Sequence, residues 1–224
     1  MIYLKEFATQ AEYDAFVESG QMQRPNVSYV EETLSVEYKK PIQYGVFIQH
    51  IDGTLLTKEQ WQSNGYANDL ANGVAVVDEK ASFVVAKESF DCTWSSFTNS
   101  LTPDLFTSND EDLAVKDMDG YHNTQKMLLK DTSGAAYICA NYIFPNGQKG
   151  YLPSVGELNI IVSYSDAVNS IMSVIAKAIP VGERMWASAQ TTANKAWLLY
   201  WNTALMESVK YITYKARPFA MLSI

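Results

Sequence analysis

The sequence predicts an α+β fold in which a small N-terminal helix-plus-hairpin unit precedes a larger domain of strands and helices. Short apolar segments bounded by turn residues, as is typical of β-strands, recur in the middle and at the end of the chain. Between them, apolar residues return at helical spacing after capping-box residues that mark helix starts. A chain of 224 residues with 47% hydrophobic residues can bury a core without help from disulfides or metals.

The first 41 residues are predicted to form a unit of their own. Thr9 and Glu12 make a capping-box pair, which predicts a short amphipathic helix over residues 10–19. The hairpin is predicted from two apolar segments joined by a short loop, Val27–Val30 and Leu34–Tyr38. Pro41 closes the unit. Because about 40 residues bury little core alone, we expect the unit to pack against a partner or against the rest of the chain.

The middle of the chain is predicted to be rich in strands and loops. Residues 45–49 predict a strand, and residues 73–77 and 82–86 predict the two arms of a hairpin. The polar stretch at residues 57–71 is expected to be irregular, and the acidic stretch at residues 98–120 is expected to be a loop.

The last part of the chain is predicted to begin with helices and to end with strands. Ser154 and Glu157 make a second capping-box pair, which predicts a helix through Tyr164, and Ser165 is expected to cap the next helix. The other predicted helices span residues 123–130, 135–142 and 166–178, and the predicted strands span residues 185–188, 196–201 and 209–217.

Charge is divided unevenly along the chain. The net charge is −8, but residues 1–131 hold 21 acids and 10 bases, which gives −11, and residues 132–224 hold 4 acids and 7 bases, which gives +3. An acidic total disfavours a nucleic-acid partner, because phosphate contacts need a basic face. Lys5 and Glu6 interrupt any signal-peptide core, and no apolar stretch reaches the length of a membrane span. We therefore expect synthesis in the cytoplasm and no membrane insertion.

The side chains that usually carry catalysis or hold metals form no known pattern. His50 and His122 lack metal-ligand spacing, and the sequence has no phosphate-binding glycine loop and no nucleophile elbow. The acidic run between Asp110 and Asp119 lacks EF-hand spacing and is expected to be a solvated loop. We therefore expect no enzymatic activity, no cofactor and no metal site.

The two cysteines allow two states. Cys92 and Cys139 are expected to be reduced, buried thiols, since a free cysteine packs as a small hydrophobic side chain. A disulfide stays open as the alternative, because it requires a proximity that spacing in the sequence does not establish.

One segment resembles a known signature. Tyr151–Leu158 is similar to the W/Y-LPS-x-GEL signature of a C-type-lectin-like domain common in Bacteroidetes surface proteins and their phages. Other segments resemble the family's DG-x-x-NT, AAxxC, WSSTQ, AW and VRPV motifs in the same order, namely Asp119–Thr124, Ala135–Cys139, Trp186–Gln190, Ala196–Trp197 and Lys215–Phe219. The resemblance implies a C-type-lectin-like domain over residues 42–224.

The N-terminal unit has a resemblance of its own. Leu4–Phe7, the predicted helix with Glu12 and Tyr13, and Pro25–Glu31 resemble the opening of virion structural proteins of crAss-like gut phages. This resemblance implies a head fibre or capsid-decorating protein on the capsid exterior, made in the host cytoplasm. Its partners would be the major capsid protein or another virion structural protein, and further copies of itself in a dimer or trimer. The residues implied in attachment are Phe7, Tyr13, Phe16, Pro25, Asn26, Val27 and Tyr29.

The final strands hold the candidate ligand-binding residues. Trp186 and Trp197 are expected to pack in the core, whereas a neighbouring set is expected to be exposed: Tyr200, Trp201, Asn202, Tyr211 and Tyr214. Aromatic rings offer large rigid contact area, so this face is expected to bind a host-surface glycan or protein. Calcium-dependent sugar binding is not expected, because the chain has no Glu-Pro-Asn loop and its Trp201-Asn202-Thr203 lacks the acid of a WND strand.

Two alternatives stay open beside the virion protein with a host ligand. The chain could be a purely structural decoration or adaptor protein of the virion that binds no host ligand. It could also be a bacterial surface adhesin, although the start of the sequence does not read as an export signal.

Overall fold

The computed structural model describes residues 2–6, 27–30, 35–39, 43–97 and 102–222. Contacts between Cα atoms divide the chain into two units, residues 1–43 and residues 44–223, which we call the N-terminal and the C-terminal unit. The predicted helix over residues 10–19 lies outside the described residues. So do most of the expected attachment residues, namely Phe7, Tyr13, Phe16, Pro25 and Asn26.

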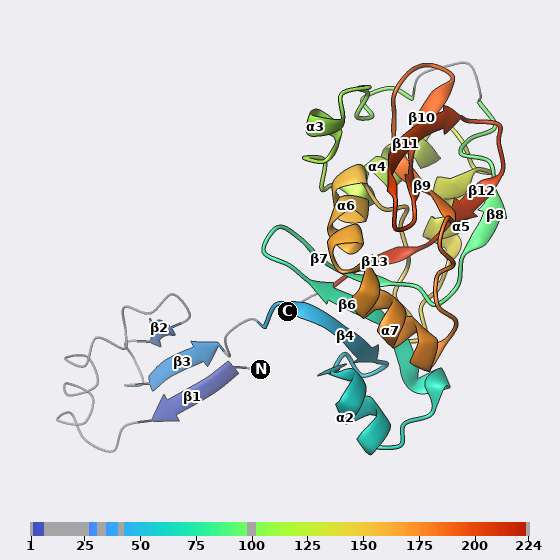
Figure 1. Cartoon of the computed structure of the whole chain (residues 1–224). Coiled ribbons are helices and arrows are strands. Elements are labelled where there is room, and N and C mark those ends of the chain that lie inside the picture. The colour runs from blue at the N-terminus through green and yellow to red at the C-terminus, as the bar shows by residue number, and fades with distance from the viewer. Residues whose placement is uncertain (1, 7–26, 31–34, 40–42, 98–101, 223–224) are drawn as a thin grey trace. The chain divides into compact units, whose positions relative to one another are not determined.

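The described part of the N-terminal unit is a three-stranded antiparallel sheet (Figure 1). Its strands are β1 (Ile2–Glu6), β2 (Val27–Val30) and β3 (Ser35–Lys39), with β3 in the middle. The predicted hairpin is confirmed, since β2 pairs with β3 in a register that sets Val27 opposite Tyr38. The sequence does not predict β1, which pairs antiparallel with the other side of β3. Of the expected attachment residues, Val27 and Tyr29 lie in β2.

The C-terminal unit combines helices with two sheets, so the predicted α+β class is confirmed (Figure 1). The first, which we call the β6 sheet, is antiparallel and has the strand order β13-β7-β6-β4-β5. Its strands are β4 (Gly45–His50), β5 (Leu55–Leu56), β6 (Ala71–Val77), β7 (Ser82–Val85) and β13 (Phe219–Met221). Pairing of Val77 with Ser82 confirms the predicted hairpin of β6 and β7.

The second sheet, which we call the β9 sheet, has the order β11-β10-β9-β12-β8. Its strands are β8 (Phe90–Cys92), β9 (Arg184–Gln190), β10 (Lys195–Tyr200), β11 (Ala204–Val209) and β12 (Tyr214–Ala216). Neighbours are antiparallel except β12 and β9, which run parallel. The predicted strands at residues 185–188 and 196–201 thus become two central strands of this sheet.

The helices after residue 119 follow the predicted positions, whereas the two short helices before it lie in stretches expected to be irregular or a loop, so those two expectations are wrong there. The helices are α2 (Lys58–Ser63), α3 (Glu111–Ala114), α4 (Gly120–Leu128), α5 (Ala135–Asn141), α6 (Val155–Ser163) and α7 (Ser165–Ile175). The Ser154–Glu157 capping box is confirmed at the start of α6. The predicted cap of α7 is wrong, because Ser165 is the first helical residue and Tyr164 occupies the N-cap position. Within the described residues, no single helix is long and apolar enough to cross a membrane, and α6 with α7 reaches that length and composition only as a pair bent by 85°.

The polar stretch at residues 57–71 is not irregular, contrary to expectation. Thr57 Oγ1 accepts a hydrogen bond from the backbone N–H of Gln60, and the backbone N–H of Thr57 donates to Gln60 Oε1, so a capping box starts α2. Trp61 is buried, which anchors the short helix to the core. A 3₁₀ turn over Asn68–Leu70 then leads into β6.

The predicted strand at residues 209–217 is broken by a turn around Lys210. The Lys210 side chain is buried, and its Nζ donates to Gln190 Oε1 and to the carbonyl of Ala193, each at 3.0 Å. The ammonium also lies 4.6 Å from the centre of the Trp94 ring. Because these contacts draw Lys210 inward, β11 ends at Val209 and the chain re-enters the sheet as β12.

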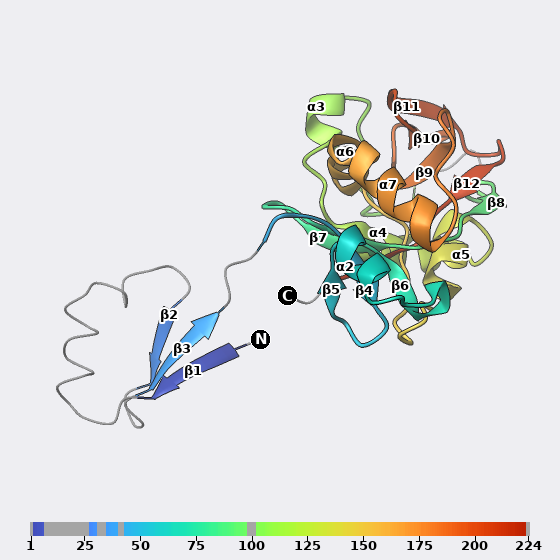
Figure 2. The same ribbon diagram turned by 60° about the horizontal axis from the view of Figure 1, so that its bottom comes forward.

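The main core joins both sheets through α6 and α7. Figures 1 and 2 show these two helices side by side, with α6 next to β9 and β10 and α7 next to β4 and β6. Their buried side chains, such as Leu158 and Met172, pack with Val74 and Leu199 from the two sheets. A second cluster lies on the other face of the β9 sheet, where α4 and α5 cover Trp186 and its neighbours.

Cys92 and Cys139 are free thiols buried in this second cluster. Burial raises the pKa of Cys92 to about 12 and that of Cys139 well above its usual range. Because the thiolate is the reactive form, both thiols should react slowly with Ellman's reagent in the native chain at pH 8. Two equivalents should react at once in guanidinium chloride. A rapid full reaction of the native chain would contradict this burial.

Candidate functional site

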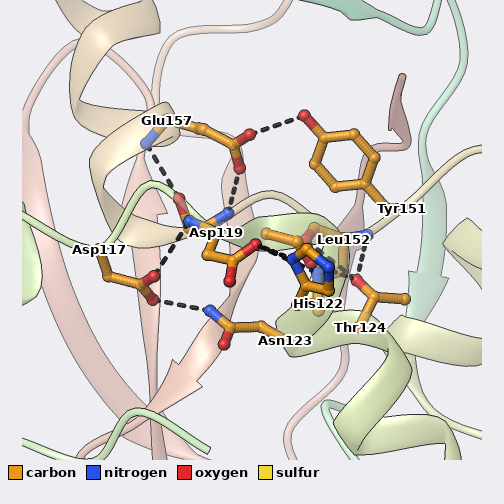
Figure 3. A network of polar contacts seen from close by, with 10 residues as sticks. Asp117, Asp119, His122, Asn123, Thr124, Tyr151, Leu152 and Glu157 are labelled. Atoms are coloured by element: carbon orange, nitrogen blue, oxygen red, sulfur yellow. Dashed lines mark hydrogen bonds and ion pairs between the residues drawn. The ribbon is translucent and has the colours of Figure 1, made fainter. Parts of the chain in front are cut away.

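Two of the motif segments meet in one buried polar network, shown in Figure 3. Glu157, at the start of α6, accepts a hydrogen bond from the Ser154 backbone N–H at 2.7 Å and another from the Tyr151 hydroxyl at 2.6 Å. Its own N–H donates to Ser154 Oγ at 3.2 Å, which completes the capping box. Both carboxylate oxygens of Glu157 therefore have partners, although the side chain is almost fully buried.

The start of α4 joins the same network from the other side. The backbone N–H of Leu152 donates to Thr124 Oγ1 at 2.9 Å, and that hydroxyl donates to the carbonyl of Gly120 at 2.8 Å. A Cβ on Gly120 would lie 2.3 Å from Glu157 Oε2 and 2.7 Å from the backbone nitrogen of Ser154. Glycine at this position is therefore what lets the two helix starts approach each other.

Asp117 and Asp119 connect the end of the acidic stretch to the network around Glu157. Asp117 accepts from Asn123 Nδ2 at 2.7 Å, and its backbone carbonyl accepts from the N–H of Gly156 at 2.9 Å. Asp119 caps α4 and lies 2.6 Å from Nδ1 of His122. Burial raises the pKa of Asp117 above its usual range. The expectation of a solvated loop is therefore wrong for Asp117, while residues 110–112 are exposed.

The Glu157 carboxyl should make the stability of the C-terminal unit depend on pH. Burial raises its pKa to about 7 from the ordinary 4.5, against hydrogen bonds from Tyr151 and Ser154 that favour the ionised form. The folded state thus keeps a proton that the unfolded state has lost, so this contribution is complete below pH 4.5 and is lost as the pH rises through 7. The full effect approaches about 3 kcal/mol.

Glu157→Gln isolates this effect, because a glutamine can hold the capping box without titrating. Urea unfolding followed by tryptophan fluorescence should show the variant gaining stability relative to the wild type between pH 4.5 and 8. A constant difference between the two proteins over this range would show that Glu157 titrates as an ordinary exposed acid.

The structure only partly assembles the predicted ligand-binding face. Trp201 is fully buried in the main core, so its assignment to an exposed face is wrong. The reason is the strand period, since Trp201 follows Trp197 and Leu199 on the face of β10 that packs under α6. Trp186 and Trp197 are buried as predicted.

The other four residues of that face divide into two groups. Asn202 is exposed in the turn after β10, with a φ of 60° in the left-handed region that asparagine tolerates. Tyr211 is 61% exposed in the turn between β11 and β12. Tyr200 and Tyr214 are half-buried at the ends of β10 and β12 and lie on either side of a cation that the sequence does not single out, Arg184.

Arg184 is the first residue of β9, and it forms a row across three strands with Tyr200 of β10 and Tyr214 of β12. It pairs with Tyr200 in the antiparallel register of β9 and β10, and its guanidinium carbon is 5.1 Å from the centre of the Tyr200 ring. The same carbon is 5.5 Å from the centre of the Tyr214 ring on the other neighbouring strand. These cation–π contacts hold the exposed guanidinium between two rings.

A hollow of about 380 Å³ adjoins this row at the end of the β9 sheet. Its lining comes from the segment after α7, from the first residue of β9, from β8 and from the start of β12: Asp91, Pro180, Val181, Gly182, Glu183, Arg184, Thr213, Tyr214 and Lys215. Gly182 has a φ of 83°, and a Cβ there would lie 3.1 Å from the Tyr200 ring. Because residue 182 has no side chain, the backbone that lines the hollow can pack closely against the Tyr200 ring. We call this hollow the Arg184 groove.

The chain matches no protein-family model and no curated protein. Among solved structures, the fold is similar to the crystal structure of a fimbrial protein from Bacteroides ovatus, with a TM-score of 0.60 and 15% sequence identity. The match covers 80% of this chain and 48% of that protein, so this chain spans about half the length of that neighbour. The comparison concerns the fold alone.

Sequence reasoning missed Arg184, Glu183 and Gly182. They lie just before the Trp186–Gln190 motif, but nothing in their spacing indicates that β10 and β12 flank β9. Only the parallel pairing of β12 with β9 brings Tyr214 beside Arg184. Within the described ranges, histidine, cysteine and acidic side chains form no group of three or more that could hold a metal ion.

Proposed function

We propose that this chain is a phage virion structural protein, a head fibre or capsid-decorating protein. Its N-terminal unit attaches to the major capsid protein or another virion protein, and its C-terminal unit, a C-type-lectin-like domain, displays a face that binds a host-surface glycan or protein. The role is one of binding and not of catalysis, and the protein acts as a dimer or trimer.

The observation that carries this proposal is the network around Glu157. Asp119–Thr124 and Tyr151–Leu158 are the segments with the most specific resemblance to the lectin-like family, and they are mutually bonded through Thr124, Leu152 and Gly120. Two segments that match a family signature and also hydrogen-bond to each other support the proposal that this part of the fold is shared with the family. The division of the chain after Gln43 supports separate roles for the two units.

The Arg184 groove and its tyrosines support the binding role. They lie on strand ends and connecting segments, where binding residues are commonly found in folded domains. Weak binding at one such face becomes useful on a virion, because many copies engage the host surface together.

A second candidate function is that of a bacterial surface adhesin. The fold likeness to the fimbrial protein from Bacteroides ovatus favours it. Under this alternative the same face would bind its ligand from the surface of a cell and not from a virion.

Immunogold electron microscopy separates the two candidates. Antibody raised against the purified full-length chain should label the heads of phage particles from an infected culture and leave uninfected cells unlabelled. Pre-immune serum provides the control. Label confined to the surface of uninfected cells would overturn the virion proposal in favour of the adhesin.

A further inference from the structure

We propose that the Arg184 groove binds a carboxylated sugar of a host-surface glycan, with the Arg184 guanidinium pairing with the carboxylate. This inference rests on the proposed function, since it names the ligand class of the face that the virion would display. Arg184 is the ligand-contacting residue, and Tyr200 and Tyr214 are positioning residues that hold it.

Charge in the groove is balanced everywhere except at Arg184. Asp91 Oδ2 pairs with Lys215 Nζ at 2.7 Å, and Glu183 Oε1 pairs with Arg217 Nη2 at 3.1 Å. Both acids that line the groove are thus already neutralised by other cations. Among the described residues, no acid forms an ion pair with Arg184, so the groove keeps one uncompensated positive charge.

The rings of Tyr200 and Tyr214 pre-organise the Arg184 guanidinium for binding a planar anion. They contact the guanidinium at 5.1 and 5.5 Å, which restricts the side chain before any ligand arrives. A guanidinium held against rings keeps its N–H groups free around its edge, where a carboxylate can accept two of them at once. A lysine in the same place would offer a point charge without this fork.

The rest of the groove suits a sugar ring. Val181 is 77% exposed, and together with Pro180 it offers an apolar wall for the C–H face of a pyranose. Asp91, Thr213 and Lys215 add polar side chains to the lining, which can bond to sugar hydroxyls. The one uncompensated positive charge of the groove matches the single negative charge of a carboxylate, whereas a doubly charged phosphate would keep an unpaired negative charge there.

The test measures binding of the full-length chain to sialyllactose and to a tetragalacturonate, each beside its carboxyl-reduced counterpart, by isothermal titration. At least one acidic probe should bind, its carboxyl-reduced form should bind at least tenfold more weakly, and added salt should weaken the acidic probe. Arg184→Gln should lower the affinity at least tenfold, and Arg184→Lys should also lower it. Lys80→Gln, which removes an exposed charge in the turn between β6 and β7, should leave the affinity unchanged.

Three outcomes would overturn the proposal. They are the absence of binding to both acidic probes, equal binding of acidic and carboxyl-reduced sugars, and unchanged affinity in Arg184→Gln. Equal binding of a sulfated neutral oligosaccharide would overturn the assignment to a carboxylate. Immunogold labelling of virion heads does not depend on any of these results, so a failure here leaves the proposed function standing on its own test.

Discussion

Replacing Arg217 by alanine is expected to lower the free energy of unfolding of the C-terminal unit by about 3–5 kcal/mol. The Arg217 side chain is 4% exposed and Glu183 is 10% exposed, so removal of the guanidinium leaves a carboxylate buried without its partner. The substitution also removes the donors to the carbonyls of Ala86 and Lys87 at 3.0 and 3.1 Å, which join β12 to the end of β7. Tryptophan fluorescence in urea reports this unit alone, because all five tryptophans lie after residue 43.

Lys215→Ala provides the matched control for Arg217→Ala. Lys215 is two residues earlier and also pairs with an acid that lines the Arg184 groove, but its side chain is 31% exposed and that of Asp91 is 65% exposed. Ion pairs of this kind contribute about 0.2–1 kcal/mol. Similar losses in the two variants would contradict the buried pairing of Arg217 with Glu183. If Arg217→Ala fails to fold, Arg217→Met keeps the aliphatic packing and should still lose more stability than Lys215→Ala.

Replacing Trp201 by alanine is expected to lower the free energy of unfolding by about 3–5 kcal/mol, as large-to-small changes in a core do. The indole has no exposed surface and packs in the cluster that joins the two sheets. The backbone N–H of Trp201 also donates to the carbonyl of Glu183, a residue that lines the Arg184 groove, at 2.8 Å. Unfolding in urea measures the loss, and any fall in ligand binding should follow from it.

Tyr211→Ala is the comparison for Trp201, because both residues belong to the face expected from the sequence. Tyr211 is 61% exposed, so its removal should change the free energy of unfolding by no more than about 0.5 kcal/mol. Equal small effects in both variants would contradict the burial of Trp201. Trp201→Phe, which keeps a ring in the core, should lie between the two.

Local signals in the sequence predict much of the fold. The capping box of Ser154 and Glu157 marks the start of α6, and short apolar segments bounded by turn residues mark β6, β7, β9 and β10. These features depend on residues a few positions apart. A capping box of Thr57 and Gln60 also marks the start of α2. It is overlooked in the sequence because residues 57–71 are mostly polar, which favours an irregular segment.

The candidate site depends on contacts that local patterns do not contain. Trp197 is expected in the core, and strand alternation puts Trp201 on the same face, so the expected exposure of Trp201 conflicts with a signal that the sequence does contain; the packing of α6 on this face decides for burial. The pairing of β12 beside β9 brings Tyr214 to Arg184 from thirty residues away in the chain. The inward turn of Lys210 likewise depends on Gln190 and Trp94, which lie in different parts of the sequence.

Host adsorption is the most direct test of the central claim, that this chain serves a virion by binding the host surface through the C-terminal unit. Host cells are incubated with purified full-length chain before phage is added, and unadsorbed phage is counted. The chain should lower adsorption in a dose-dependent way, and Arg184→Gln should do so less at equal concentration, while Lys80→Gln should match the wild type. Unchanged adsorption at saturating concentrations of the wild-type chain would contradict the account.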